Sequence, residues 1–394
     1  MGAESPLAGL PLLEDLPPLE GARVLVRTDY NVPLDERDGQ RWVADDFRIR
    51  ASLETLGWLQ ARGARVTVCS HLGRPDGAFD PRWTMEPVAR RLHELCPQVE
   101  LLENLRFDPG EKADAPEFVD RLVAGFDAYV NEAFGVAHRA HGSVVGPPRR
   151  LPSAAGRLLA REVEVLGGLL RQPKRPFVVV LGGAKVADKI GVVRSLAAVA
   201  DVIAVGGAMA FTFLAALGRQ VGSSIVDPEH LEECRALLVE QEAPILLPSD
   251  VVALEPGGRA LGAGVPGVSD TKVLGPHIPD GWQGLDIGPD TASAFEEAIA
   301  SAKTLFWNGP LGAFEDPRFA EGTRRIAQAV AACPGHTVVG GGDSVRAIDR
   351  LGVAERIDFV STGGGASLAL LEHGDLPALA ALRGAPNAPS AYRS

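Results

Sequence analysis

The sequence has 394 residues, enough chain for two or three domains with full hydrophobic cores. Its 39 Lys and Arg residues stand against 51 Asp and Glu, a formal charge of −12. This balance argues against a general nucleic-acid binder, because affinity for a phosphate backbone needs a basic face. An anionic ligand must therefore meet local clusters of Arg, Lys and His.

Targeting and covalent features are sparse in this chain. The four cysteines lie far apart and form no CxxC pair, which argues against a disulfide framework or a zinc site. The segment 1–21 has no basic region and is interrupted by Pro and acidic residues, so no signal peptide is expected. The apolar stretch 202–217 is shorter than the roughly 20 residues that span a membrane. We therefore expect a cytoplasmic protein without a membrane span.

Apolar runs typical of strands alternate with helical patterns through the first half of the chain. The expected elements, in order, are a strand at 22–30, a helix at 48–63, a strand at 64–71, a helix at 86–95, a strand at 99–104, a helix at 116–126, a strand at 127–135 and a long helix at 156–170.

The second half repeats this scheme. It is expected to hold a strand at 176–183, a helix at 188–200, strands at 201–207 and 284–288, a helix at 291–302, strands at 304–309 and 336–342, a helix at 343–351 and a strand at 359–364. Such alternation predicts parallel sheets with helices on both faces.

A break is expected near 171–176, RQPKRP, where two prolines follow a long helical pattern. The predicted fold class is α/β, with two similar-sized domains, each a parallel sheet with helices on both faces, separated by a cleft. The predicted domains are 1–172 and 173–378. For the tail 379–394, packing back on the first domain is one expectation.

Polar side chains follow every predicted strand of the first half. They are Asp29 and Asn31 after the first strand, His71 and Arg74 after the second, Asn104 and Arg106 after the third, and His138, Arg139 and His141 after the fourth, with Arg48 at the start of the first helix. Ligands bind beyond the carboxyl ends of open parallel sheets. A lone loop arginine is usually only a solvated charge, but cationic or imidazole groups at four strand ends predict an anion site.

Glycine clusters mark the strand–helix joints of the second half, at 182–183, 206–207, 340–342 and 363–365. Such joints expose backbone N–H groups and a helix N-terminus to an anion. A single pair would suggest only a tight turn. Two triplets, one followed by Asp343, favour a polyphosphate with Mg²⁺, a metal that takes few carboxylates and otherwise phosphate and water oxygens.

Only six of the basic residues are lysines, and Lys185 and Lys189 lie together in GGAKVADKI after a predicted strand. We expect them one helical turn apart on one face. Compact ammonium groups there suggest contact with phosphate, and the alternative is a solvated helix start.

Several motif matches are rejected. GAGVPG (262–267) fits the letters of a dinucleotide fingerprint, but its Pro and the residues after it open no helix. No GxxxxGK[ST] occurs, and Ser367 in GASLA lacks the second Gly of a nucleophile elbow.

Taken together, these segments resemble the phosphoglycerate kinase family over essentially the whole chain. The resemblance is carried, in order, by VRTDYNVP (26–33), DDFRIRA (45–51), SHLGRPDG (70–77), ENLRF (103–107), NEAFGVAHRAH (131–141), LGGAKVADKI (181–190), GGAMAFTFL (206–214), WNGPLGAFE (307–315), GGGDSV (340–345) and STGGGAS (361–367). The departures are Thr28-Asp29-Tyr30 where Val-Asp-Phe is commoner, Ala208 at a usual Gly position and Ser344 where Thr is commoner. None removes a charged group.

The resemblance implies reversible phosphoryl transfer between 1,3-bisphosphoglycerate with ADP and 3-phosphoglycerate with ATP, by a monomer that uses Mg²⁺ and closes its domains. It implies a glycerate site at Asp29, Tyr30, Asn31, Arg48, His71, Leu72, Gly73, Arg74, Arg106 and Arg139. It implies a nucleotide site at Lys189, Glu315, Gly341, Gly342, Asp343 and Ser344, with Asp343 at the metal. It places Arg48, Lys185, Lys189, Gly363 and Gly364 around the transferring group.

The chemistry agrees with this implication. Toward ATP the nucleophile would be a carboxylate, which is already ionised at neutral pH, so no general base is needed and none is conspicuous. Two alternatives stay open. A nicotinamide dehydrogenase is disfavoured by the missing fingerprint. A catalytically idle nucleotide-binding scaffold would be indicated by loss of Lys189, Asp343 or Arg48, and all three are present.

Overall fold

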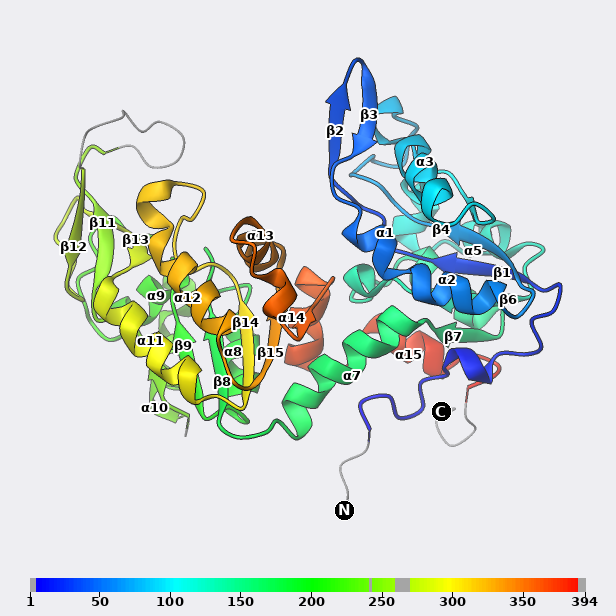
Figure 1. Cartoon of the computed structure of the whole chain (residues 1–394). Coiled ribbons are helices and arrows are strands. Elements are labelled where there is room, and N and C mark those ends of the chain that lie inside the picture. The colour runs from blue at the N-terminus through cyan, green and yellow to red at the C-terminus, as the bar shows by residue number, and fades with distance from the viewer. Residues whose placement is uncertain (1–4, 241–242, 259–269, 389–394) are drawn as a thin grey trace. The chain divides into compact units, whose positions relative to one another are not determined.

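The computed structural model describes residues 5–240, 243–258 and 270–388, so the rejected motif at 262–267 lies outside the described residues. The chain divides into two compact units, Met1–Gly167 with His373–Ser394 (unit 1) and Gly168–Glu372 (unit 2) (Figure 1). Within the described ranges, no helix is both long and apolar enough to cross a membrane.

The predicted elements of unit 1 occur in the predicted order, together with others that the sequence did not predict. The elements are β1 (Arg23–Arg27), β2 (Leu34–Arg37), β3 (Gln40–Val43), α1 (Phe47–Ala51), α2 (Leu53–Gln60), β4 (Arg65–Cys69), α3 (Glu86–Leu95), β5 (Glu100–Leu101), α4 (Pro109–Ala113), α5 (Pro116–Val123), β6 (Ala128–Asn131), α6 (Gly142–Val145), β7 (Ser153–Ala155), α7 (Arg157–Arg171, which runs on into unit 2) and α15 (Pro377–Arg383). Those that the structure adds to the prediction are β2, β3, α4, α6, β7 and α15.

The sheet of unit 1 is parallel, with the strand order β5-β4-β1-β6-β7. Successive residues of β1 point to opposite faces, as strand geometry requires. Val24 packs in a core with Leu56 of α2, whereas Leu25 packs in another core with Phe118 of α5. Because both faces are covered, the residues that follow the strands can meet at the carboxyl edge of the sheet.

The boundaries of the units differ from those predicted. The first boundary falls inside α7 rather than at 172/173. Residues 373–378, predicted for the second domain, belong to unit 1, because the chain returns there to form α15, and Ala378 N–H donates to the Ala137 carbonyl. Helix α15 also contacts β7 (Figure 1).

Unit 2 holds the remaining elements. They are β8 (Phe177–Leu181), α8 (Ile190–Ala197), β9 (Val202–Val205), α9 (Met209–Ala216), α10 (Leu231–Glu240), β10 (Ile245–Leu246), β11 (Val251–Leu254), β12 (Thr271–Leu274), β13 (Gln283–Ile287), α11 (Pro289–Ser301), β14 (Thr304–Asn308), α12 (Glu321–Ala331), β15 (His336–Gly340), α13 (Gly342–Arg350), β16 (Phe359–Val360) and α14 (Gly364–His373, which runs on into unit 1).

The main sheet of unit 2 is parallel in the order β10-β9-β8-β14-β15-β16. All residues of β8 and β14 are buried, as expected for strands covered on both faces. Strand β13, predicted within the parallel scheme, instead pairs antiparallel with β11 in a separate sheet, β12-β11-β13. A parallel crossover usually needs a helix, and the described part of 247–282 contains no α-helix.

Candidate active site

Charged side chains from several strand ends of unit 1 gather around His71, which follows β4 and is only 2% exposed. Burial lowers the pKa of His71 well below its usual value, and the positive charges of Arg27, Arg106, Arg48 and Arg139 lower it further. We call Asp29, Arg48, His71, Arg106 and Arg139 the strand-end cluster.

Hydrogen bonds fix the cluster locally. Arg48 donates to Asp29 Oδ2, and Asp29 Oδ1 lies 3.9 Å from His71 Nδ1. Arg106 Nη1 donates to the Gly73 carbonyl at 2.7 Å, while the Gly73 N–H donates to Asn31 Oδ1 at 2.8 Å. The loop after β4 is therefore tied to the ends of β1 and β5.

Several buried donors here have no hydrogen-bond partner among the residues that the structure describes. They are Arg106 Nε, Asn131 Nδ2 and His138 Nδ1, and the ring nitrogen His141 Nδ1 is likewise buried without a hydrogen-bond partner in the described part of the chain. His138 Nδ1 carries the proton, because His138 Nε2 accepts from Arg139 Nε at 3.2 Å. Buried donors are costly to leave unpaired, so this edge of the sheet is suited to a ligand rich in acceptor oxygens.

The imidazoles around the cluster are held neutral. Burial, helped by Arg106 and Arg139, lowers the pKa of His141 to about 4, and burial with Arg139 also lowers the pKa of His138. Burial and neighbouring arginines lower the pKa of Arg106 to about 10, which leaves it charged at neutral pH. The positive charge of this edge therefore comes from arginines and does not change near pH 7.

Three predicted glycerate-site residues are placed differently from the rest. Tyr30 and Leu72 are fully buried, and the Tyr30 hydroxyl lies 2.6 Å from Ser52 Oγ. Their side chains join the core of unit 1, and their assignment to the glycerate site stays a prediction. Arg74 is exposed, and its side chain has no hydrogen bond or ion pair with other described residues.

The glycine joints of unit 2 come together at the carboxyl edge of its main sheet. A Cβ on Gly207 would lie 2.6 Å from the Gly183 nitrogen, and one on Gly309 would lie 2.2 Å from the Gly182 carbonyl oxygen. Gly207, Gly183 and Gly309 all have positive φ, so only glycine suits them. We call Gly182, Gly183, Gly207, Gly309, Gly341, Gly342, Gly363 and Gly364 the glycine edge.

Lys189 turns inward against this edge. Its ammonium donates to the Gly182 carbonyl and, at 3.0 Å, to the Asn308 carbonyl. Burial lowers the pKa of Lys189 to about 8, although nearby Asp343 favours the charged form. The expectation that Lys185 lies one helical turn away is wrong. Helix α8 begins only at Ile190, because the chain turns after Gly182, and Lys185 is exposed.

The other predicted nucleotide residues lie close to each other. Arg346 of α13 pairs with Asp343 and has Nη2 3.7 Å from Glu315 Oε1. Ser344 is fully buried, and its hydroxyl oxygen accepts the Gly309 N–H at 2.6 Å. A Cβ on Gly364 would lie 3.8 Å from the Gly342 nitrogen, so α13 and α14 begin side by side.

The donor set around Asp343 fits a metal that arrives with a nucleotide. Among the described residues, no three His, Cys, Asp or Glu side chains are grouped to hold an ion by themselves. Asp343 offers one half-exposed carboxylate in the first turn of α13, beside backbone N–H groups. Mg²⁺ bound to phosphates needs only one or two protein carboxylates, so these residues suit it.

Known proteins are similar to this chain in sequence and in fold. The sequence profile of the family described as phosphoglycerate kinase matches residues 13–101 and 96–374. The chain belongs to the phosphoglycerate kinase family. The phosphoglycerate kinase of Rubrobacter xylanophilus is 48% identical, with 92% of this chain and 96% of that protein covered. That of Thermus thermophilus is 49% identical, with 94% and 99% covered.

Solved structures of phosphoglycerate kinases agree with the family assignment. The enzyme from Coxiella burnetii has a TM-score of 0.83 and 34% identity, with 94% of this chain and 98% of that chain covered. The enzyme from Pyrococcus horikoshii has a TM-score of 0.78 and 30% identity, with 95% and 98% covered. This phosphoglycerate kinase family member is a phosphotransferase with a carboxyl group as acceptor, and the idle-scaffold alternative is not supported.

Sequence reasoning missed three residues of this family member's site region. Arg27, Glu111 and Ser143 form a fully buried polar group beneath His71. The sequence indicated Arg27 only weakly, because this charged residue directly follows the apolar run VLV of the strand RVLVR. It did not indicate Glu111 or Ser143, because only the fold brings them to Arg27.

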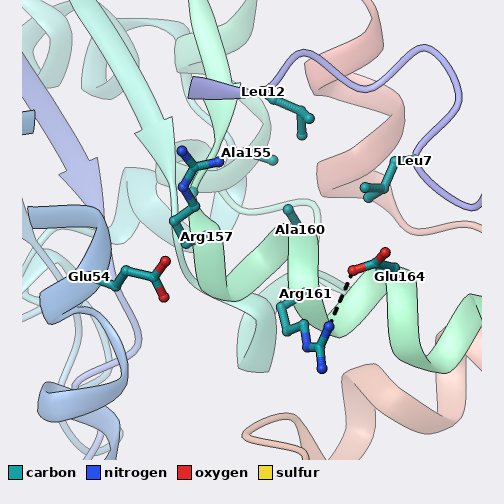
Figure 2. A pocket seen from close by; sticks show the side chains of 9 residues that line it. Leu7, Leu12, Glu54, Ala155, Arg157, Ala160, Arg161 and Glu164 are labelled. Atoms are coloured by element: carbon teal, nitrogen blue, oxygen red, sulfur yellow. Dashed lines mark ion pairs between the residues drawn. The ribbon is translucent and has the colours of Figure 1, made fainter. Parts of the chain in front are cut away.

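A separate cavity of about 340 Å³ lies in unit 1, beside the start of α7 (Figure 2). It is lined by Leu7 and Leu12 and by charged side chains that include Arg157 and Arg161. Both arginines are already paired, Arg157 with Glu14 and Arg161 with Glu164. None of its lining residues belongs to the predicted site of this phosphoglycerate kinase family member.

Proposed function

We propose that the strand-end cluster binds the glycerate substrate and that the glycine edge binds the Mg-nucleotide. The reaction is the reversible transfer of a phosphoryl group between 1,3-bisphosphoglycerate with ADP and 3-phosphoglycerate with ATP. The observation that carries the division of roles is the gathering of arginine charges around His71, in a unit that also holds buried donors without a partner among the described residues, such as Arg106 Nε. An anion with several acceptor oxygens would satisfy both the charges and the donors.

On the glycerate side, each arginine has a geometric reason for its role. Arg106 and Arg139 supply planar forks that can pair with the oxygens of a remote phosphate, and exposed Arg74 can join them. Arg48, half-buried at the start of α1 and paired with Asp29, is placed at the edge of the cluster. We assign Arg48 to the transferring phosphoryl group.

On the nucleotide side, the backbone does most of the binding. The starts of α13 and α14 present N–H groups that suit phosphate oxygens. Lys189 would exchange its carbonyl partners for a phosphate, and Gly363 and Gly364 would line the path of the transferring group, with Lys185 nearby. Glu315 is exposed and can accept from ribose hydroxyls. Mg²⁺ arriving with the nucleotide would be held by Asp343 and would neutralise phosphate charge.

No general base is assigned, because the attacking carboxylate is ionised at neutral pH. The protein's part is to orient two polyanions and to stabilise charge with fixed donors. Since the two ligands are assigned to different units, we propose that the units close around them in each turnover and exclude water. We further propose a monomer of the cytoplasm.

Calorimetric titration of the full-length protein tests the division of roles. Losing a hydrogen-bonded charged contact should weaken binding roughly 10–100-fold. Arg106→Ala should therefore weaken 3-phosphoglycerate binding and spare Mg-ADP binding, and Asp343→Ala should do the reverse. The proposal is wrong if Asp343→Ala weakens 3-phosphoglycerate binding as much as Mg-ADP binding.

A further inference from the structure

Arg27, the last residue of β1, is a fully buried cation beneath the strand-end cluster. Its Nη2 lies 3.8 Å from Glu111 Oε1, and neither side chain has any exposed surface. A buried charge is costly to keep unless it is paired and hydrogen-bonded. The surroundings of the Arg27 guanidinium therefore fix where its N–H groups point.

Three segments hold this guanidinium in one orientation. Arg27 Nε donates to Ser143 Oγ at 2.7 Å, and Arg27 Nη1 donates to the Thr28 carbonyl. Ser143 Oγ donates in turn to Glu111 Oε1 at 2.7 Å, and Ser143 N–H donates to Glu111 Oε2 at 2.8 Å. The Tyr129 hydroxyl donates to the Ser143 carbonyl at 2.7 Å. This network leaves Arg27 Nη2 directed at His71.

In the contact between Arg27 and His71, only Arg27 can donate the hydrogen bond. Arg27 Nη2 lies 3.3 Å from His71 Nδ1. A guanidinium has only donors, so His71 Nδ1 must present its lone pair. A proton on Nδ1 would face an N–H group of Arg27, and the nearest carboxylate oxygen, Asp29 Oδ1 at 3.9 Å, is too distant to accept it. The His71 proton therefore belongs on Nε2.

We propose that Arg27 is a positioning residue that fixes His71 as a neutral imidazole protonated on Nε2. His71 then presents an N–H donor, never an acceptor, to the glycerate ligand. This consequence rests on the proposed function of the strand-end cluster. It makes His71 a specificity element, because an N–H donor favours a carboxylate or hydroxyl oxygen and disfavours a ligand with a donor at the same place.

The surrounding charges keep the imidazole neutral. Arg27, Arg48, Arg106 and Arg139 oppose a second proton, and burial opposes it further. Asp29 lies near the ring but is paired with Arg48. Among the described residues, none hydrogen-bonds to His71 Nε2, so that donor is free for a ligand.

Nitrogen NMR of ¹⁵N-histidine-labelled, full-length, ligand-free protein tests the tautomer directly. The chain has eight histidines, and the signals of His71 are those that disappear in His71→Gln. We expect the neutral Nε2–H pattern for His71 throughout pH 5.5 to 8. A neutral Nδ1–H pattern, or a charged ring at pH 7, would overturn the proposal.

The role of Arg27 is tested by removing both members of the buried ion pair, which avoids leaving one charge unpaired. In Arg27→Leu/Glu111→Gln, a mixture of His71 tautomers should appear. If that variant folds and retains the pure Nε2–H pattern, Arg27 does not set the tautomer. Ser143→Ala, which frees only one side of the guanidinium, is the milder second variant and should shift the tautomer ratio in the same direction.

Two amide substitutions test the donor toward the ligand. The side-chain amide of His71→Gln places its NH₂ near the position of Nε2, whereas that of His71→Asn reaches only the position of Nδ1. We expect His71→Gln to keep KM for 3-phosphoglycerate within about threefold and His71→Asn to raise it about tenfold or more, with smaller changes in kcat. A lower KM for His71→Asn than for His71→Gln would overturn the donor assignment. If neither variant changes KM, the proposed glycerate site itself fails, whatever the tautomer.

Discussion

The strand-end cluster of unit 1 is built from charged side chains, whereas the glycine edge of unit 2 is built mainly from backbone. In unit 1 the arginines surround a buried histidine, and further buried groups hold them in place. In unit 2 positive-φ glycines bring loops within van der Waals distance, and Lys189 is the buried cation among the residues of this unit that the structure describes.

The difference concerns how each site obtains positive potential. Arginine charge is permanent, and the neutral histidines add none, so the proposed glycerate site should be insensitive to pH near neutrality. Backbone N–H groups carry only partial charge, so the proposed nucleotide site should depend on Lys189, whose pKa is lowered to about 8. The two sides should therefore respond differently to substitution and to pH.

The largest expected effect is on Arg48. Arg48→Ala should lower kcat by roughly 10²–10³, because a donor that acts mainly on the transferring group contributes most in the transition state. KM for 3-phosphoglycerate should change less, and Arg48→Lys should recover little activity. Arg50 of the same helix, exposed and paired with Asp46, provides the control. If steady-state kinetics of Arg48→Ala show a raised KM with unchanged kcat, Arg48 only binds the substrate and does not act on the transferring phosphoryl group.

A substitution at Gly364 can test whether ligand phosphate comes close to the backbone there without disturbing the fold. A Cβ on Gly364 would meet its nearest neighbour at 3.8 Å, so Gly364→Ala should fold normally. The added methyl group would occupy space that the phosphates need, and KM for Mg-ADP should rise about tenfold, the equivalent of 1.4 kcal/mol.

Gly275→Ala is the matched control, since a Cβ on Gly275 meets nothing within 4 Å and Gly275 follows β12, a strand of the separate three-stranded sheet. Circular dichroism melts establish that both variants fold. Equal KM values for the two variants would show that ligand phosphate does not approach Gly364.

The pH dependence of binding should separate the two sides. A lysine with a pKa of about 8 is charged below that pH and loses its charge as the pH rises through it. Mg-ADP affinity should therefore fall above pH 8, by up to about tenfold per pH unit, while 3-phosphoglycerate affinity stays level from pH 7.5 to 9. Lys189→Arg should remove the decline. Equal Mg-ADP affinity at pH 7 and 9.5 in titration calorimetry would refute this role for Lys189.

The smallest expected effect is on the free energy of unfolding, which a buried carboxyl group of unit 1 makes dependent on pH. Glu132 follows β6, and its Oε2 accepts the N–H groups of Leu158 and Leu159 at the start of α7. Burial raises the pKa of Glu132 to about 7. The folded state thus keeps a proton that the unfolded state loses near pH 4.5, and this contribution to stability declines as the pH rises from about 4.5 to 7.

Glu132→Gln removes this titration and keeps an acceptor for the helix. Relative to the starting protein, its free energy of unfolding should rise by roughly 1–3 kcal/mol between pH 5 and 8, as chemical denaturation would measure. Glu117→Gln, exposed on α5, should not change the slope. A constant difference between pH 5 and 8 would rule out a titrating Glu132.

The sequence predicted every strand of the two parallel sheets except β7 and β10, because buried strands require continuous apolar runs, as in β8 and β14. It also located the polar groups at strand ends, because parallel strands bring their carboxyl ends to one edge. It missed the β2–β3 hairpin, whose strands are mostly exposed and which turns at Asp38-Gly39 with positive φ.

The other features that the sequence did not predict depend on tertiary structure. The sequence did not show that the Tyr30 side chain packs in the core, whereas the adjacent Asp29 and Asn31 are more exposed. The antiparallel pairing of β13 with β11 depends on which neighbour offers a free edge, which no local pattern reveals. Two of the groups that hold Arg27, Glu111 and Ser143, lie more than 80 residues further along the chain, and a single sequence gives no sign of such contacts.

The return of the chain to unit 1 has a consequence for biosynthesis. Helix α15 contributes to unit 1, where Asn387 pairs with the backbone of Ser153 beside β7. On a ribosome, all of Gly168–Glu372 emerges before this last segment. Unit 2 is therefore the first unit that can be completed during translation, and unit 1, although begun first, waits for the segment that starts at His373.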